Sequence, residues 1–156
     1  MFKSIFIALI AAAALTAIVS GCGDSDSAAS ATPLTKAQFI KQGDAICVKS
    51  DKAQVNAYLD YANDNPKKAE TKKGQREVVV LAGLPPLKKA IEELGELGVP
   101  KGDEAQVEAI VGGMEKALEE AEADPSKVYE SSVSTPFDKT DALARKYGFV
   151  ACGDAL

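Results

Sequence analysis

The sequence predicts an all-α domain, an antiparallel up-down bundle of about four helices over residues 36–156. Apolar residues recur at steps of three and four in four successive stretches, which is the spacing of one helix face. Short segments rich in proline, glycine and asparagine separate these stretches, and short connections favour antiparallel neighbours. The only strand-like run, Val-Val-Val-Leu at residues 78–81, has no comparable run to pair with, so we expect it to be helical.

The first helix is expected from Thr35 to about Asn63. Thr35 and Gln38 have the spacing of a capping box, and an apolar face begins directly after them. The sequence Asp-Asn-Pro at residues 64–66 ends the helix. The predicted apolar face consists of Phe39, Gly43, Ile46, Ser50, Ala53 and Ala57, flanked by Ile40, Cys47, Tyr58 and Tyr61.

The second helix is less regular, because residues 67–76 are highly charged and two prolines follow them. Proline lacks the backbone donor and clashes with the preceding turn, so we expect Pro85 and Pro86 to kink or break this helix. Its exit is marked by Gly98 and Pro100. Its predicted apolar positions are Leu84, Leu87, Ile91, Leu94 and Gly98.

The third helix has the clearest pattern. Asp103 is the expected N-cap, and Asp-Pro at residues 124–125 closes the helix. Gly112 and Gly113 in its middle cost about 1 kcal/mol each relative to alanine. We expect this pair to permit close approach of a neighbouring helix; a hinge or a ligand contact is the alternative. The predicted apolar stripe consists of Val107, Ile110, Val111, Met114, Ala117, Leu118 and Ala121.

The fourth helix is expected to begin at Thr135, with Pro136 at its first helical position. Gly148 is the expected left-handed C-cap, after which the chain brings Cys152 back toward the core. The predicted inner face consists of Phe137, Thr140, Leu143, Ala144 and Tyr147.

Residues 1–21 have the pattern of a secretory signal peptide, with Lys3 followed by an apolar run from Ile5. The run of about 15 residues is shorter than the roughly 20 that cross a bilayer as a helix. Its end, Val-Ser-Gly followed by Cys22, resembles the lipobox of bacterial lipoproteins. This resemblance implies cleavage before Cys22 and a diacylglyceryl lipid on it; an ordinary secretory signal is the alternative. We expect residues 22–35 to form a flexible tether on the extracytoplasmic face of a cell membrane.

The remaining cysteines fit an exported protein. If Cys22 carries lipid, Cys47 and Cys152 form an even pair, which is expected to be a disulfide outside the cytoplasm. The bridge would close a loop of about 105 residues and stabilise the fold by about 4–5 kcal/mol. Cleavage leaves 135 residues with 17 basic and 23 acidic side chains, an acidic balance that argues against nucleic acid as a partner.

Two segments resemble small exported bacterial proteins, especially actinobacterial ones. Phe-Ile-Lys-Gln-Gly-Asp-Ala-Ile-Cys at residues 39–47 is similar to their opening, and Tyr-Gly-Phe-Val-Ala-Cys-Gly at residues 147–153 to their usual ending. These relatives are uncharacterised lipoproteins or secreted proteins. The resemblance therefore implies a fold, a disulfide and a location, and no catalytic or binding residue.

The composition excludes several kinds of chemistry. The chain has no histidine, which removes Ser-His-Asp and Cys-His catalysis and histidine-ligated zinc. It also lacks a glycine-rich phosphate loop. Acidic and amide side chains cluster at the end of the first helix without the spacing of an EF-hand, so turn chemistry is the simpler interpretation. This cluster consists of Asp60, Asn63, Asp64 and Asn65.

A basic cluster is the main charge anomaly of this acidic chain. We expect its side chains to pair with the acidic third helix or to remain hydrated; contact with lipid headgroups or an acidic partner is the alternative. The cluster consists of Lys67, Lys68, Lys72, Lys73 and Arg76.

These observations predict a protein that is not an enzyme and has no catalytic residue, cofactor or metal site. The leading hypothesis is a non-catalytic interaction or scaffold module that contacts another component of the cell envelope. The alternative is a carrier that holds a small apolar ligand between its helices. The carrier hypothesis predicts a cavity near Gly83, Gly112, Gly113 and the two prolines at 85 and 86.

Overall fold

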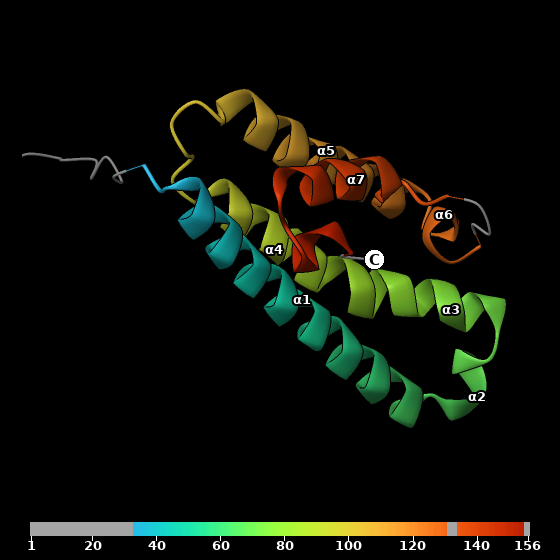
Figure 1. Cartoon of the computed structure of the whole chain (residues 1–156). Coiled ribbons are helices and arrows are strands. Elements are labelled where there is room, and N and C mark those ends of the chain that lie inside the picture. The colour runs from blue at the N-terminus through green and yellow to red at the C-terminus, as the bar shows by residue number, and fades with distance from the viewer. Residues whose placement is uncertain (1–32, 131–133, 155–156) are drawn as a thin grey trace, which may run out of the picture. The chain divides into compact units, whose positions relative to one another are not determined.

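The computed structural model describes residues 33–130 and 134–154, and this part of the chain is all-α, with helices and no strand (Figure 1). The expected signal peptide, Cys22 and most of the expected tether lie outside the described residues. The α-helices are α1 (Lys36–Asp64), α2 (Pro66–Ala69), α3 (Lys72–Val78), α4 (Leu84–Gly95), α5 (Glu104–Ala123), α6 (Ser126–Tyr129) and α7 (Asp138–Tyr147). A π-helix, η1 (Val79–Gly83), joins α3 to α4, and a 3-10 helix, η2 (Ala151–Gly153), follows α7.

The up-down bundle is built by four helical units. The first is α1 and the second is the run α3–η1–α4; α5 and α7 are the third and fourth. In chain order α1 packs on α4, α4 on α5 and α5 on α7, while η2 returns to α1 (Figure 1). One hydrophobic core joins these contacts. Its largest buried members are Phe39, Leu84, Leu87, Ile91, Leu94, Ile110, Met114, Leu118, Phe137, Tyr147 and Phe149.

The predicted start of α1 is confirmed. Gln38 donates its backbone N–H to Thr35 Oγ1 at 3.3 Å, and the Thr35 N–H donates to Gln38 Oε1 at 2.9 Å. The two residues thus satisfy two of the amide groups that the first turn of a helix leaves without partners. The helix ends at Asp64, one residue beyond the expected end.

The second helix is broken, but the break precedes the prolines. Pro85 and Pro86 lie in the first turn of α4, where a missing N–H costs little. The irregularity lies in η1, where the Leu84 N–H donates to the Val79 carbonyl, five residues back. This wider π-turn accommodates the carbonyl groups that the proline rings would otherwise crowd. The run at residues 78–81 is helical, as expected.

The start of α5 differs from the expectation. Asp103 occupies the N-cap position, but its side chain makes no capping hydrogen bond. Its Oδ2 instead accepts a 2.7 Å hydrogen bond from the Tyr147 hydroxyl, which joins the start of α5 to the end of α7. The apolar stripe of α5 is buried as predicted, with Val111 partly exposed at its edge.

The start of α7 also differs from the expectation, because the helix begins at Asp138 and Pro136 precedes it. The Phe137 N–H donates to Thr135 Oγ1, and the Thr135 hydroxyl donates to Asp138 Oδ1. These local bonds form a turn that competes with helix at residues 135–137. The end of the helix is as predicted: Gly148 has φ of +121°, a conformation that side chains disfavour.

An aromatic cluster packs beside the start of α1. The rings of Phe39, Tyr147 and Phe149 lie with centroids 5.6–6.1 Å apart. The Lys36 ammonium lies 4.0 Å from the Tyr147 ring centroid, where its charge meets the negative face of the ring. Gly43 is required here, because a Cβ on it would lie 2.5 Å from Phe149 Cε1.

The predicted apolar face of α1 is buried only in its first half. Phe39, Gly43, Cys47 and Ser50 are buried, whereas no residue of α1 after Ser50 is. The expectation of a buried face up to residue 57 is therefore wrong. We call residues 51–83, which carry the second half of α1 and its return through α2, α3 and η1, the distal hairpin.

Candidate functional site

The predicted disulfide between Cys47 and Cys152 is confirmed. The bridge joins α1 to η2 with Cα atoms 5.2 Å apart, a separation that suits a disulfide. Cys47 is 3% exposed and Cys152 is fully buried. Because thiol exchange needs access to a sulfur atom, this burial favours a structural role for the bridge over a redox role.

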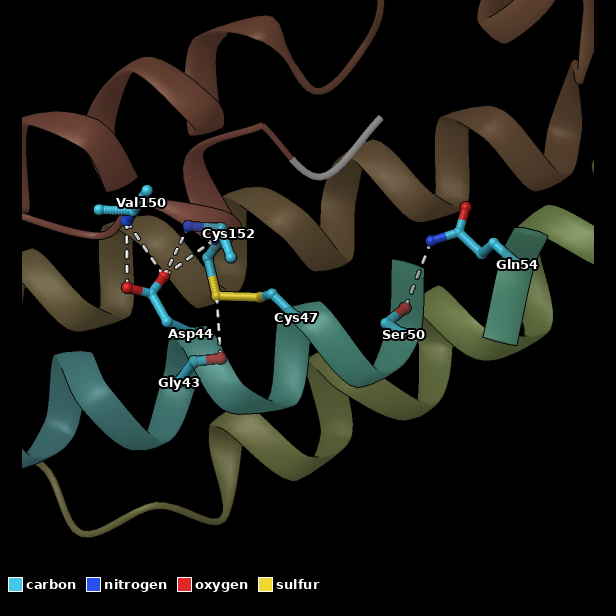
Figure 2. Close-up of a disulfide and its surroundings, with 8 residues drawn as sticks. Gly43, Asp44, Cys47, Ser50, Gln54, Val150 and Cys152 are labelled. Atoms are coloured by element: carbon cyan, nitrogen blue, oxygen red, sulfur yellow. Dashed lines mark hydrogen bonds between the residues drawn. A yellow bond between two sulfur atoms is a disulfide. The ribbon is translucent and has the colours of Figure 1, made fainter. Parts of the chain in front are cut away.

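Asp44, one turn before Cys47 on α1, binds the backbone at the start of η2 (Figure 2). Its carboxylate accepts hydrogen bonds from three successive amides, those of Val150, Ala151 and Cys152, at distances of 2.8–3.2 Å. A negative charge is favourable here because these are the free N–H groups at the start of η2. The sequence analysis missed this role, although Asp44 lies within the conspicuous block at residues 39–47.

One contact in this region is not an ordinary hydrogen bond. The Cys152 sulfur lies 3.2 Å from the Gly43 carbonyl oxygen (Figure 2). A sulfur atom in a disulfide carries no hydrogen to donate, so this contact reflects close packing of η2 on α1. The buried disulfide and the Asp44 hydrogen bonds therefore hold η2 against the first half of α1.

An apolar groove lies in the distal hairpin, where the face of α1 is uncovered. Its volume is about 280 Å³, and α1, α3, η1, α4 and α6 contribute to its walls. The wall residues are almost all aliphatic, with the Gln54 amide and the Tyr58 hydroxyl as the exceptions. The groove is lined by Gln54, Val55, Tyr58, Val78, Val79, Ala82, Gly83, Leu84 and Val128.

The groove has free space beside Gly83. A Cβ on Gly83 would meet only Gln54 Oε1, at 4.0 Å. Gly83 ends the π-helix η1, and this helix type is frequent at functional sites because it changes the direction of neighbouring side chains. Gln54 is held by a hydrogen bond from its Nε2 to Ser50 Oγ at 3.3 Å, so its oxygen remains available toward the groove. The groove can thus receive an apolar group with a hydrogen-bond donor at one end.

Large apolar side chains surround this groove at the surface. Val55 is 57% exposed and Leu59 is 50% exposed on α1, and Tyr58 is exposed between them. Exposed apolar residues that gather in one region mark contact surfaces more often than isolated ones do. We call these exposed residues, Val55, Tyr58 and Leu59, the rim of the groove. The groove and its rim are the strongest candidate for a binding site in the described part of the chain.

The other glycines that the carrier hypothesis invoked do not line this groove. A Cβ on Gly113 would lie 2.6 Å from Thr140 Oγ1 on α7, so this glycine permits close helix approach, as expected. Gly112 is exposed, and nothing lies within 4 Å of a Cβ placed on it. Of the features that the carrier hypothesis named, Gly83 borders the groove of about 280 Å³, and Pro86 borders a smaller hollow of about 50 Å³.

One carboxyl is buried without its full set of partners. Asp141 on α7 is 5% exposed, and its Oδ1 has no hydrogen-bond partner among the described residues. Burial raises the pKa of this carboxyl to about 6, while the Arg145 guanidinium lowers it in part. Arg145 also donates to the Gly153 carbonyl and pairs with Asp154 at 3.1 Å, so Asp141 lies beside the contacts that hold η2 to α7.

The remaining residues singled out in the sequence lie apart from the groove. In the basic cluster, Lys72 pairs with Glu130 at 3.5 Å, which joins α3 to the end of α6. In the acidic and amide cluster at the end of α1, Asn65 Nδ2 donates a hydrogen bond to the Tyr61 carbonyl and so stabilises the turn that follows the helix. Within residues 33–130 and 134–154, no three histidine, cysteine, aspartate or glutamate side chains converge as a metal site would require. Nor does any described helix combine the length and apolar character needed to cross a membrane.

No family model, curated protein or solved structure matches this chain. The assignment of function therefore depends on the residues and on the geometry of the described part.

Proposed function

We propose that this chain is a non-catalytic binding module of the bacterial cell envelope, held on the extracytoplasmic face of a membrane by a lipid on Cys22. The apolar groove of the distal hairpin carries the binding part of the proposal. The lipobox-like sequence before Cys22 supports the anchor. The buried disulfide agrees with export, because such bridges persist in oxidising compartments.

Binding without catalysis fits the chemistry of the groove walls. The only polar groups of its lining side chains are the Gln54 amide and the Tyr58 hydroxyl. Neither group is paired with a base that would make it a nucleophile, and the chain has no histidine to supply one. The walls offer aliphatic surface and one hydrogen-bond acceptor, which suit recognition of an apolar group.

Two occupants fit the groove, and they correspond to two functions. The first is an apolar side chain of another envelope protein, which makes the module an interaction or scaffold protein. The second is a small, uncharged apolar ligand, which makes it a carrier. The open space at Gly83 favours the second, because pockets that enclose small ligands need such a gap between their walls.

The first experiment is native mass spectrometry of the chain from Gly23 onward, produced through an oxidising compartment. All the core contacts, hydrogen bonds and ion pairs described above, and the disulfide, lie within residues 33–154, so this length retains the fold. A mass excess that disappears on denaturation identifies a ligand. Gly83→Leu, which places a side chain in the groove, is expected to abolish the excess, and Gly112→Leu on the exposed side of α5 is expected to keep it.

A bare polypeptide mass directs the search to a protein partner. A photo-reactive residue at Val55, on the rim of the groove, is then expected to give a cross-link in intact cells that Gly83→Leu removes. The same probe at the exposed Glu108 of α5 is the control. Absence of both a ligand and a cross-link specific to the rim would contradict the proposed binding site.

The anchor has an independent test. Cys22→Ala is expected to block processing of the full chain or to release it from the membrane fraction. Normal processing and membrane retention of Cys22→Ala would contradict the lipid anchor and leave the groove proposal intact.

A further inference from the structure

A second exposed surface lies on the helical run that forms one wall of the groove. Lys73, Arg76 and Val80 recur at steps of three and four, so they share one side of α3 and η1, and Leu81 lies beside them. The residues that line the groove from this run, such as Val78 and Ala82, are different ones. We call the surface made by Lys73, Arg76, Val80 and Leu81 the α3–η1 face.

Positive charge is concentrated at this end of an otherwise acidic protein. Residues 66–78 contain five basic and two acidic side chains, whereas the whole chain has a net charge of −5. The acidic Glu77 accepts a 2.6 Å hydrogen bond from the Tyr61 hydroxyl on α1, which lowers the pKa of Glu77. Among the described residues, no acidic side chain lies within 4.0 Å of the charged groups of Lys73 or Arg76 as an ion-pair partner. Both side chains are exposed, and their acidic partners act at longer range. Lys73 contributes to the lowered pKa of Glu77, and Arg76 adds to the Ser126 hydrogen bonds that lower the pKa of Asp124.

Apolar side chains continue the same surface. Leu81 is 63% exposed and Val80 is 41% exposed, one to two turns beyond the two cations. Together with Glu122 and Pro125 at the end of α5, they border a shallow hollow of about 630 Å³. Glu122 is engaged by Lys88 at 3.8 Å. Exposed aliphatic residues beside long basic side chains are typical of a helix that lies in a membrane interface.

We propose that the α3–η1 face docks on an anionic lipid surface, with Val80 and Leu81 at the acyl boundary and Lys73 and Arg76 among the headgroup phosphates. The charge distribution favours an anionic surface over a neutral one as the occupant. An anionic surface attracts the two cations of this face and repels the acidic rest of the protein, so it orients the α3–η1 face toward itself. Lysine and arginine on flexible stems suit a fluid array of phosphates without fixed geometry.

The length of chain between Cys22 and α1 permits this docking. The 14 residue-to-residue steps from Cys22 to Lys36 span at most about 50 Å when extended, and α1 is about 43 Å long. A chain attached at Cys22 therefore keeps α3 within reach of the bilayer that holds the anchor. This step depends on the proposed lipid anchor, but the affinity of the α3–η1 face for lipid does not.

The test is cosedimentation of the chain from Gly23, which has no lipid, with vesicles of phosphatidylglycerol and phosphatidylcholine in equal parts. Binding is expected at low salt, is expected to weaken at 0.5 M salt, and is expected to be absent with pure phosphatidylcholine. Lys73→Gln combined with Arg76→Gln is expected to weaken binding about 25-fold, at about fivefold for each charge. Leu81→Ser is expected to weaken it about tenfold.

Matched controls separate this surface from general charge and from the groove. Lys116→Gln with Lys139→Gln removes two exposed cations of α5 and α7, and Val150→Ser removes an exposed apolar side chain near η2. Both are expected to bind vesicles as the parent does, and so is Gly83→Leu, which tests the groove. Circular dichroism and the unfolding midpoint establish that every variant is folded.

Three results would overturn the proposal. The first is equal binding to charged and neutral vesicles, and the second is equal loss of binding in the double variant and its control. The third is retention on a polyglutamate matrix without binding to the anionic vesicles, which would assign the α3–η1 face to an acidic protein. None of these results bears on the groove.

Discussion

Replacing Asp141 with asparagine is expected to stabilise the protein at neutral pH, and the gain is expected to disappear in mild acid. Asp141 is 5% exposed and its Oδ1 has no hydrogen-bond partner in the described part of the chain. Its charged form is therefore poorly solvated, and burial raises its pKa from 3.8 to about 6. Of the charged groups around it, Arg145 opposes this shift, while Asp138 and Asp154 reinforce it.

The sign and the size of the effect follow from proton linkage. A carboxyl with a raised pKa binds its proton more tightly in the folded state than in the unfolded state. The free energy of unfolding therefore falls as the pH rises from about 3.8 to about 6. A shift of about 2 units is worth about 3 kcal/mol, at about 1.36 kcal/mol for each unit. Asp141→Asn is thus expected to recover up to about 3 kcal/mol at pH 7.5 and little at pH 4.

The assay is urea denaturation followed by circular dichroism, at intervals from pH 4 to pH 7.5. Asp60→Asn is the matched control, because Asp60 is an exposed carboxyl on α1. The control is expected to keep the pH profile of the parent, whereas Asp141→Asn is expected to have a flatter one. A profile for Asp141→Asn that coincides with the parent profile would refute the argument that burial of this charge destabilises the fold.

Three further predictions concern the stability of the described fold. Reducing the disulfide is expected to cost about 4–5 kcal/mol because its loop of 105 residues is released, and a melting temperature unchanged by reductant after complete reduction would contradict this. Asp44→Ala is expected to cost about 2–3 kcal/mol in urea denaturation because three amides lose their charged acceptor, whereas Asp60→Ala is expected to change stability little. Gly112→Ala is expected to stabilise α5 by up to about 1 kcal/mol, and Gly113→Ala to destabilise the protein through a clash with α7; equal melting temperatures would contradict the packing role of the second glycine.

Local patterns in the sequence were sufficient to predict most of the fold. The capping box at Thr35 and the positive φ at Gly148 depend on residues within one turn of each other, so their spacing predicts them directly. The buried stripe of α5 follows from helical periodicity for the same reason. The disulfide was predicted from two expectations: that Cys22 carries lipid, which leaves Cys47 and Cys152 as a pair, and that the chain is exported.

The features that the sequence analysis did not predict depend mostly on contacts between segments that are distant in the sequence. The side chains of Asp103 and Asp44 have hydrogen-bond partners 44 and 106 to 108 residues away, so no local pattern reveals them. The turn at Thr135 was missed because the Thr135 hydroxyl bonds locally. The first helical position is therefore Asp138, two residues after the expected Pro136.

The groove was missed for a simple geometric reason. Periodicity identifies the apolar face of α1 but does not say how much of that face a neighbour covers. The helix α1 has 29 residues and is about 43 Å long, whereas α4, which packs on it, has 12 residues and is about 18 Å long. Where α4 and η2 pack on α1, residues up to Ser50 are buried, and the apolar pattern beyond Ser50 remains at the surface.

This difference in helix length also separates stability from binding. The disulfide, the Asp44 hydrogen bonds and the aromatic cluster all act on the first half of α1, where the chain ends of the domain meet. The distal hairpin has the hydrogen bond from Tyr61 to Glu77 and the exposed ion pair between Lys72 and Glu130, which contributes little. Segments with few buried contacts open at lower free energy than the core, and binding surfaces are drawn from them. A fold stabilised at one end can therefore expose apolar residues at the other end without losing its stability.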